Sequence, residues 1–140
     1  MRSARVILVR HVDTTWSECG RLQGSQDPPL SERGRARLDR LARFVARLAG
    51  GDRLLVLSSP LRRAACTAES IAMALGVSVQ KADELREVSL GQWEGMLEKD
   101  IAMSGAERRA WEVLDPEWSW GGNGDRIATR VAATERFLSG

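Results

Sequence analysis

Histidine and cysteine are scarce in this sequence, with one histidine and two cysteines among 140 residues. Cys19 and Cys66 have no neighbour at the spacing of a metal-binding or redox pair, so we expect free thiols in a reducing compartment. Apolar runs are short as well, and none is long enough for a signal-peptide core or a membrane span. These absences favour a cytoplasmic protein without a membrane partner.

Long runs of one charge are also absent. The 21 basic and 19 acidic residues give a formal net charge of +2 and are spread along the chain. We therefore expect no nucleic-acid partner, because a basic stripe is not indicated. A chain of this length is enough for one modest domain with one core, and no internal repeat divides it.

Strand-like and helical segments alternate along the chain. Three short apolar runs predict strands, at Val6–Val9, Leu54–Ser58 and Val77–Val79. Four longer segments have the apolar periodicity of helices, at about residues 32–48, 61–75, 97–114 and 125–138. Ser31 is the expected N-cap of the first helix, and Gly50 and Gly76 stand where the first two helices end. This alternation favours an α/β fold with a parallel sheet.

Loops that carry arginine follow two of the predicted strands. The first strand leads directly into Arg10 and His11, and the second leads into the loop 58–64, which contains Arg62 and Arg63. Ligands of open α/β folds bind at the carboxyl ends of the strands. We therefore expect the histidine and these arginines to meet at one edge of the sheet.

Five short strings of residues carry a family resemblance. In order they are Leu8-Val9-Arg10-His11, Gly20-Arg21-Leu22-Gln23-Gly24, Pro29-Leu30-Ser31-Glu32-Arg33-Gly34, Ser58-Ser59-Pro60-Leu61-Arg62-Arg63-Ala64, and Leu85-Arg86-Glu87 with Gly91-Gln92-Trp93-Glu94-Gly95. With them the chain resembles the histidine phosphatase (phosphoglycerate mutase-like) family over nearly its whole length. The resemblance implies a three-layer α/β/α fold with a mostly parallel sheet, formed by residues 1–140 as a single domain.

The resemblance implies that His11 attacks a phosphoryl group and becomes phosphohistidine. Arg10 and Arg63 would hold the phosphoryl oxygens. Arg63 is preferred to Arg62 because it matches the family's arginine, which leaves Arg62 to face solvent or the rim of the site. A neutral imidazole is a competent nucleophile at pH 7, and guanidiniums stabilise the charge of a transferring group. We also expect the start of the following helix to offer backbone N–H groups to the anion.

Glu87 matches the family's proton donor to the leaving oxygen, and Glu94 is the competing carboxylate. Such a donor must be protonated before the ester bond breaks. Gln23 and Gly24 belong to a long polar loop that resembles the family's substrate loop. They would bring an amide group and a close backbone approach to the phosphate.

Three features depart from the family pattern. Val12 stands where the family usually has glycine, so a β-branched side chain lies where the backbone passes close to phosphate. Ser17 stands where the family commonly has asparagine, and it keeps a hydroxyl for the phosphate but lacks the two donors of the amide. The family's second histidine, in a Ser-His-Gly segment on a later strand, has no counterpart because His11 is the only histidine. We therefore expect a domain that is incomplete at its C-terminus.

Three functions fit this sequence. The leading interpretation is a phosphomonoester hydrolase that acts through phosphohistidine on a small phosphorylated metabolite, with no cofactor and no metal. Phosphoglycerate mutase-type phosphotransfer is the second, but the stretch from Gly95 to Trp120 is shorter than a mutase insertion. The third is a non-catalytic protein of the same fold that binds a phospholigand or a partner. Trp16 and Trp93 are candidate walls of the pocket, and an open strand edge would allow a homo-oligomer.

Overall fold

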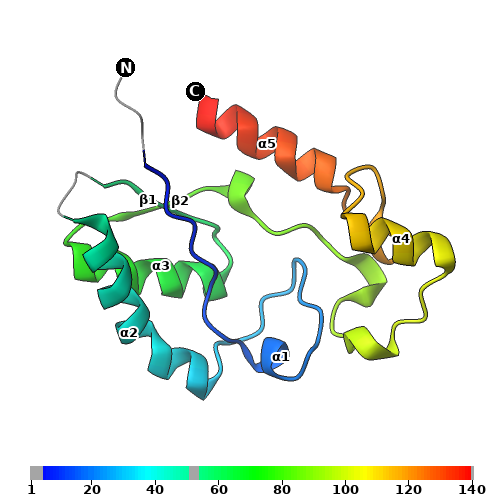
Figure 1. The fold of residues 1–140 in the computed structure, drawn as a ribbon, viewed down its shortest axis with the longest axis horizontal. Helices are drawn as coiled ribbons and strands as arrows, with labels where there is room; N and C mark the ends of the chain where they lie inside the picture. The colour runs from blue at the N-terminus through cyan, green and yellow to red at the C-terminus, as the bar shows by residue number, and fades with distance from the viewer. Residues whose placement is uncertain (1–4, 51–53, 140) are drawn as a thin grey trace.

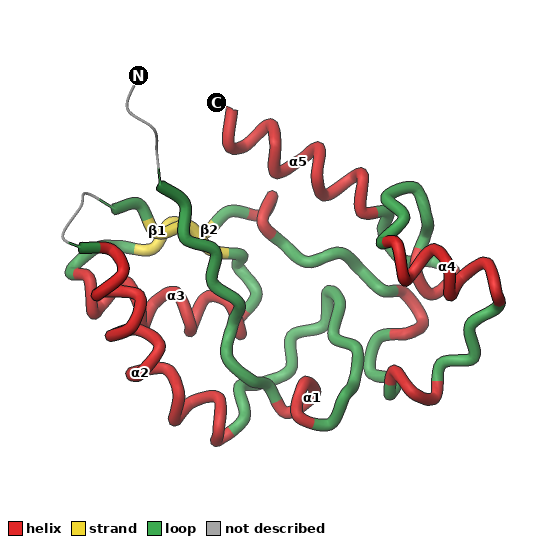
Figure 2. The backbone as a smooth tube through the Cα atoms, viewed as in Figure 1, coloured by secondary structure: helices red, strands yellow, loops and turns green. Residues whose placement is uncertain are grey.

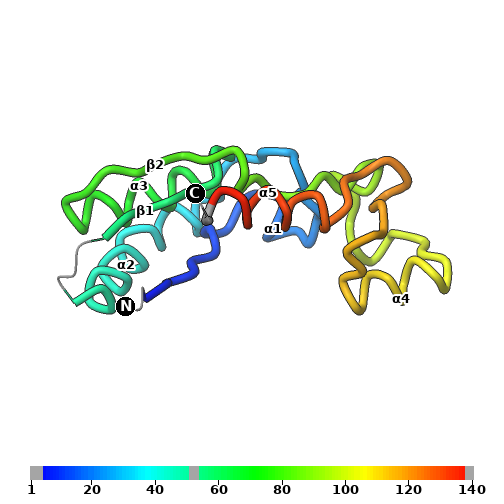
Figure 3. Tube along the Cα trace, turned by 90° about the horizontal axis from the view of Figure 1, so that it is seen from above, coloured from blue at the N-terminus to red at the C-terminus, as the bar shows by residue number. Residues whose placement is uncertain are grey.

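The computed structural model describes residues 5–50 and 54–139 (Figure 1). Its helices and strands are α1 (Thr15–Glu18), α2 (Glu32–Ala49), β1 (Val56–Ser58), α3 (Arg62–Leu75), β2 (Val79–Lys81), α4 (Gly105–Val113) and α5 (Ile127–Ser139). Short 3-10 turns lie between them, namely η1 (Asp83–Leu85), η2 (Gly91–Trp93), η3 (Glu98–Asp100) and η4 (Trp120–Gly122). The helices α2 and α3 and both strands gather at one end of an elongated molecule, and α4 lies at the other end (Figures 1 and 3).

The helices α2 and α3 end where the sequence predicts, and α2 begins at its predicted cap. The Oγ of Ser31 accepts a hydrogen bond of 2.9 Å from a backbone N–H in the first turn of α2. Gly50 and Gly76 end the two helices with φ of 66° and 67°, a left-handed conformation that suits glycine. Apolar side chains of both helices, among them Val45 and Ile71, form a buried cluster that holds the pair together.

The strands β1 and β2 form a parallel pair joined by α3, with Val56 opposite Val79. The predicted parallel pairing is therefore confirmed. The second strand of the pair begins at Val79 rather than at Val77, however. The backbone N–H of Val77 donates to the carbonyl oxygen of Ala72 at 3.0 Å and closes the end of α3. Because that N–H is already used, strand pairing starts only beyond it.

The prediction of a first strand at Val6–Val9 is wrong for the described residues. Figure 2 shows this segment as a loop, and Val6 and Leu8 are 75% and 92% exposed. A strand requires a hydrogen-bonded neighbour, and within residues 5–50 and 54–139 no strand pairs with this segment. Its composition is that of a strand, but composition alone does not supply a partner.

A second buried cluster is rich in tryptophan. Trp93 and Trp120 are buried, and the ring of Trp111 packs edge-on against both, with ring centroids 5.8 and 5.3 Å away. Edge-to-face contacts of this kind are favoured by the charge distribution of aromatic rings. The cluster also contains Ile101 and Ala110, so it joins the η2 turn to α4 and η4.

The helix predicted over residues 97–114 is divided in the structure. Its first part is the single turn η3, and α4 begins anew after Ser104. Ser104 and Glu107 form a capping box, in which the hydroxyl of Ser104 accepts from the N–H of Glu107 and the carboxylate of Glu107 accepts from the N–H of Ser104. A capping box satisfies the free N–H groups of a helix start, so it favours a break at this point.

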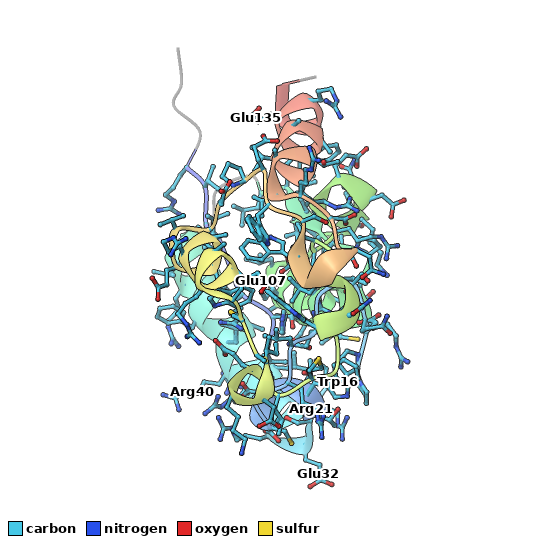
Figure 4. The ribbon with its side chains drawn as sticks, turned by 90° about the vertical axis from the view of Figure 1, so that its right-hand side faces the viewer. Trp16, Arg21, Glu32, Arg40, Glu107 and Glu135 are labelled. Carbon is cyan, nitrogen blue, oxygen red and sulfur yellow. The ribbon has the colours of Figure 1, made fainter. Side chains whose placement is uncertain are left out.

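The loop around α1 lies against the stretch between η2 and η3. Leu22 donates its N–H to Met96 at 3.0 Å and accepts from the N–H of Gly95 at 2.8 Å. The guanidinium of Arg21 donates to the carbonyl oxygen of Gly95 at 2.6 Å, and the ring of Trp16 covers the same glycine (Figure 4). None of the described helices is both long and apolar enough to cross a lipid bilayer.

Candidate active site

One cavity of about 750 Å³ brings together segments that are far apart in the sequence. All seven residues singled out from the sequence line it: Arg10, His11, Ser17, Gln23, Gly24, Arg63 and Glu87. They come from the segment before α1, from α1 and the loop after it, from the start of α3 and from the stretch after η1. In the described part of the chain, no group of three or more histidine, cysteine or acidic side chains is placed to hold a metal ion.

His11 binds the backbone through one ring nitrogen and leaves the other for chemistry. Its Nδ1 lies 2.7 Å from the carbonyl oxygen of Val12. A carbonyl oxygen only accepts, so we assign the proton to Nδ1 and the lone pair to Nε2. Burial lowers the pKa of His11 from its ordinary value, and the bond to Val12 opposes this shift. The charges of Arg63 and Arg10 lower the pKa further, so the neutral imidazole is favoured.

Arg63 is held by the loop that follows α1. Its side chain is buried whereas that of Arg62 is exposed, as the sequence predicts. Its Nη2 donates to the carbonyl oxygen of Gly24 at 2.7 Å, and its Nη1 donates to that of Gln26 at 2.5 Å. These bonds use two of the five guanidinium N–H groups. The guanidinium is therefore fixed by the protein and still has donors for an anion in the cavity.

The start of α3 does not offer its N–H groups to the cavity, contrary to the expectation from the sequence. The carboxylate of Asp27 accepts from the backbone N–H of Arg62 at 2.7 Å and from that of Arg63 at 3.4 Å. It also lies 3.8 Å from Nη1 of Arg63. An internal carboxylate thus occupies the positive end of the helix. Anion binding at this edge depends on side chains instead.

Thr14 connects Gln23 and Ser17, two residues that line the cavity together with His11. It is fully buried, and its hydroxyl donates to Oε1 of Gln23 at 2.8 Å and accepts from the N–H of Ser17 at 3.0 Å. With Oε1 held, the amide NH2 group of Gln23 is the part that remains to donate to phosphate. The hydroxyl of Ser17 accepts from the N–H of Thr14 at 2.8 Å and donates to its carbonyl oxygen at 3.2 Å. Ser17 therefore completes a capping box with Thr14, the N-cap of α1, and its role in phosphate binding stays a prediction.

Val12 packs into the protein rather than against a ligand. Its side chain is buried, and its N–H donates to Oγ1 of Thr67 at 3.2 Å. Thr67 in turn donates its hydroxyl to the carbonyl oxygen of Arg63 at 2.8 Å. The backbone N–H of Val12 therefore fastens the segment before α1 to α3, and the β-branched side chain is accommodated in the protein interior.

Glu94 and Glu87, the two candidate proton donors, have different surroundings. The carboxylate of Glu94 accepts from four groups: the N–H and the hydroxyl of Ser25, the amide of Gln26 and the N–H of Leu90. Burial raises the pKa of Glu94, but these hydrogen bonds outweigh it and hold the pKa below its usual value. Glu94 is therefore ionised and poorly suited to give up a proton.

Glu87 lies closer to the expected chemistry. It is exposed and lines the cavity, and one carboxylate oxygen accepts from the N–H of Val88 at 2.9 Å. Its charge interacts with both His11 and Arg63. Of the two carboxylates, Glu87 is the one that lines the cavity, and its role as the donor stays a prediction.

One wall of the cavity is not predicted from the sequence. That wall is largely apolar and lies between α4 and α5, with two arginines beside it: Trp111, Leu114, Trp120, Ile127, Arg86 and Arg130. Trp16 and Trp93, the candidates from the sequence, lie elsewhere, because Trp16 covers Gly95 and Trp93 is buried in the tryptophan cluster. The sequence does contain a signal for this wall, because four of the five tryptophans fall within residues 93–120.

Comparison with known proteins places the chain in a family. The model of the histidine phosphatase superfamily (branch 1) matches residues 6–138. The chain is 41% identical over 136 residues to phosphoserine phosphatase 1 of Hydrogenobacter thermophilus, which covers 96% of this chain and 62% of that protein. It is 38% identical over 129 residues to glucosyl-3-phosphoglycerate phosphatase of Mycolicibacterium vanbaalenii, which covers 91% of this chain and 55% of that protein.

A solved structure agrees with these relatives. A mycobacterial glucosyl-3-phosphoglycerate phosphatase in complex with VO3 matches with a TM-score of 0.80 and 32% identity, over 92% of this chain and 60% of that one. The chain thus spans between 55% and 62% of the length of the relatives named here. The likeness confirms the α/β fold class with a parallel sheet. The match over residues 6–138 shows that the chain belongs to the histidine phosphatase superfamily, branch 1.

Proposed function

We propose that this protein hydrolyses the phosphate monoester of a small metabolite through a phosphohistidine at His11. The observation that carries the proposal is the cavity in which a neutral imidazole with an available Nε2 meets Arg10 and Arg63. The relatives support it, because those named above are phosphatases of phosphorylated small molecules.

The first step transfers the phosphoryl group to the protein. The lone pair on Nε2 of His11 forms a bond to phosphorus while the bond from phosphorus to the ester oxygen breaks. Arg10 and Arg63 stabilise the charge on the transferring group. Glu87, in its protonated form, gives its proton to the leaving oxygen, which departs as an alcohol.

The second step releases phosphate. A water molecule gives a proton to the Glu87 carboxylate and attacks the phosphorus of the phosphohistidine. The bond between phosphorus and Nε2 breaks, inorganic phosphate leaves, and the imidazole is free again. The protein returns to its starting state, and neither step consumes a cofactor.

The size and lining of the cavity favour a substrate with an organic group of moderate size. A volume of about 750 Å³ is within the usual range for small-molecule sites and exceeds the needs of phosphate alone. The part of the cavity beside Trp111 and Trp120 is apolar, so it suits the carbon skeleton of the leaving alcohol. Arg86 and Arg130 lie nearby and favour an alcohol that carries a negative charge.

A phosphate-release assay tests the proposed function. The protein is given a panel of sugar, nucleotide and carboxylic-acid phosphates, and His11→Ala is compared with Arg62→Ala, a change to an exposed side chain. We expect release by the wild type and by Arg62→Ala, and none above background by His11→Ala. Binding of phosphate esters without release by the wild type would favour a non-catalytic binding protein.

We also propose a cytoplasmic location and no nucleic-acid partner. Both cysteines are free, with Cys19 exposed, as expected in a reducing compartment. Acidic and basic residues are nearly balanced along the chain. Exposed apolar side chains on the segment before α1, such as Leu8, favour association with a second copy.

A further inference from the structure

Glu94 joins two loops that both line the candidate active site. One is the loop 23–27, which follows α1, and the other is the stretch 87–95, which contains Glu87. The carboxylate binds the first through Ser25 and Gln26 at 2.8 to 2.9 Å and the second through the N–H of Leu90 at 2.9 Å.

The loop held by Glu94 carries the groups that orient Arg63. The carbonyl oxygens of Gly24 and Gln26, on either side of Ser25, accept from the two terminal nitrogens of the Arg63 guanidinium. A guanidinium gains its precision in binding phosphate from a fixed planar orientation. Displacement of these two carbonyls would therefore release the arginine.

The packing around Gly24 shows how closely the loop and Glu94 fit. Gly24 has a φ of +52°, and a Cβ at this position would run into Oε1 of Glu94 and lie 2.9 Å from the backbone nitrogen of Leu90. The loop thus approaches the carboxylate without space for a side chain. The Glu94 carboxylate accepts from four donors and packs against the backbone of Gly24, so this contact is a specific part of the structure rather than a chance surface contact.

We propose that Glu94 is a positioning residue, which through the loop 23–27 holds Arg63 in the orientation that binds the transferring phosphoryl group. It does not touch the reacting atoms, and it is not the proton donor. The proposal rests on the proposed function for its consequence in catalysis, but the position of Arg63 can be measured without any substrate.

The single histidine makes that measurement direct. The charged groups that act on His11 are Arg63 and Arg10, which lower its pKa, and Glu87, which raises it. Glu94→Gln removes a negative charge, which by itself would lower the pKa of a nearby cation or leave it unchanged. If the change also lets Arg63 move away, the pKa of His11 rises. Loss of the charge alone therefore predicts a lower or unchanged pKa of His11, whereas movement of Arg63 predicts a higher one.

The experiment is an NMR titration of the His11 ring in the full chain, for the wild type, Glu94→Gln and Glu107→Gln. Glu107 is the matched control, because its carboxylate, like that of Glu94, accepts from a serine, here in the capping box of α4. Glu107 lies on α4 (Figure 4) and does not line the cavity. We expect a higher pKa of His11 in Glu94→Gln alone. An unchanged or lower pKa in that variant, or an equal rise in Glu107→Gln, overturns the proposal.

Inorganic phosphate, added to the same samples, separates this proposal from the proposed function. We expect Glu94→Gln to bind phosphate on the order of tenfold more weakly than wild type, the effect of a misplaced binding group. If wild type binds no phosphate, the proposed function fails while the pKa comparison still decides the role of Glu94. If Glu94→Gln does not fold, Ser25→Ala takes its place. This change removes the 2.9 Å hydrogen bond from the Ser25 hydroxyl to Glu94, and we expect it to raise the pKa of His11 as well. An unchanged pKa in Ser25→Ala contradicts the proposal.

Discussion

At the scale of single residues, the site depends on how each side chain is held. His11 is oriented by a bond from Nδ1 to the backbone, which leaves Nε2 available, and Arg63 is oriented by two carbonyl oxygens. Buried polar groups that are fully bonded stay in one geometry. In phosphoryl transfer, charged donors that are already fixed in place stabilise the charge of the transition state.

The environment of His11 predicts the pH dependence of the reaction. Burial, Arg63 and Arg10 lower its pKa from the ordinary value of 6.5. The imidazole therefore stays neutral and nucleophilic as the pH falls through 6.5, and it becomes protonated only below that value. We expect the ring titration by NMR, and the acid limb of the rate of phosphorylation, to have midpoints below 6.5. A midpoint at or above 6.5 would mean that the ring is solvated or paired with a carboxylate.

Arg63 and Arg62 provide a matched pair of substitutions. Arg63→Ala should weaken the binding of inorganic phosphate by about 1.5–3 kcal/mol, the range for a hydrogen bond to a charged group. Arg62→Ala should change it little, because that side chain is exposed. Isothermal titration with phosphate measures both. Equal losses would show that the arginine was assigned to the wrong position.

At the scale of elements, loops rather than helices form most of the cavity. The loop 23–27 is fixed between Arg63 and Glu94, and the stretch 87–95 is fixed by Glu94 and by the tryptophan cluster. Loops positioned by a rigid scaffold are a common location for binding groups. Here the scaffold is the unit of β1, α3 and β2 with α2 packed on it.

Two glycines test how tightly the loop is fixed. Gly20 and Gly24 both have positive φ, of 71° and 52°, so alanine at either position should cost about 1 kcal/mol of unfolding free energy. A Cβ on Gly20 meets nothing within 4 Å, whereas one on Gly24 collides with Glu94. We therefore expect Gly24→Ala to lose a further ~1–3 kcal/mol. Denaturant unfolding measures the difference, and equal losses for the two variants would contradict the packing described here.

Elements with local signals were predictable, and elements that depend on distant partners were not. Ser31, Gly50 and Gly76 mark helix ends by their own chemistry, and the structure has them there. The segment Val6–Val9 has the composition of a strand, but pairing needs a neighbour that no local pattern specifies. The seven candidate residues that line the cavity were predicted from motifs, whereas the wall at Trp111 and Trp120 forms only when separate segments pack together.

In the whole molecule, the extended segment before α1 exposes apolar side chains. Leu8 is 92% exposed and Val6 75%. Extended segments with exposed apolar side chains recruit further strands or further copies. This surface is distinct from the site, since none of these side chains lines the cavity.

We expect the purified 140-residue chain to associate through this surface. Sedimentation velocity should show species larger than a monomer at micromolar concentration, and Leu8→Lys should shift the distribution toward the monomer because a charge opposes burial. Met73→Lys, a change to another exposed apolar side chain on α3, serves as the control. A monodisperse monomer in the wild type would exclude this segment as an interface.

Whether His11 accepts the phosphoryl group is decided by identifying the phosphorylated residue. The protein is incubated with a phosphate ester that it hydrolyses, quenched, and digested under conditions that preserve acid-labile phosphate. We expect one acid-labile phosphate on the peptide that contains His11, and no label in His11→Ala. Phosphate on a serine or an aspartate, or label that persists in His11→Ala, would contradict it.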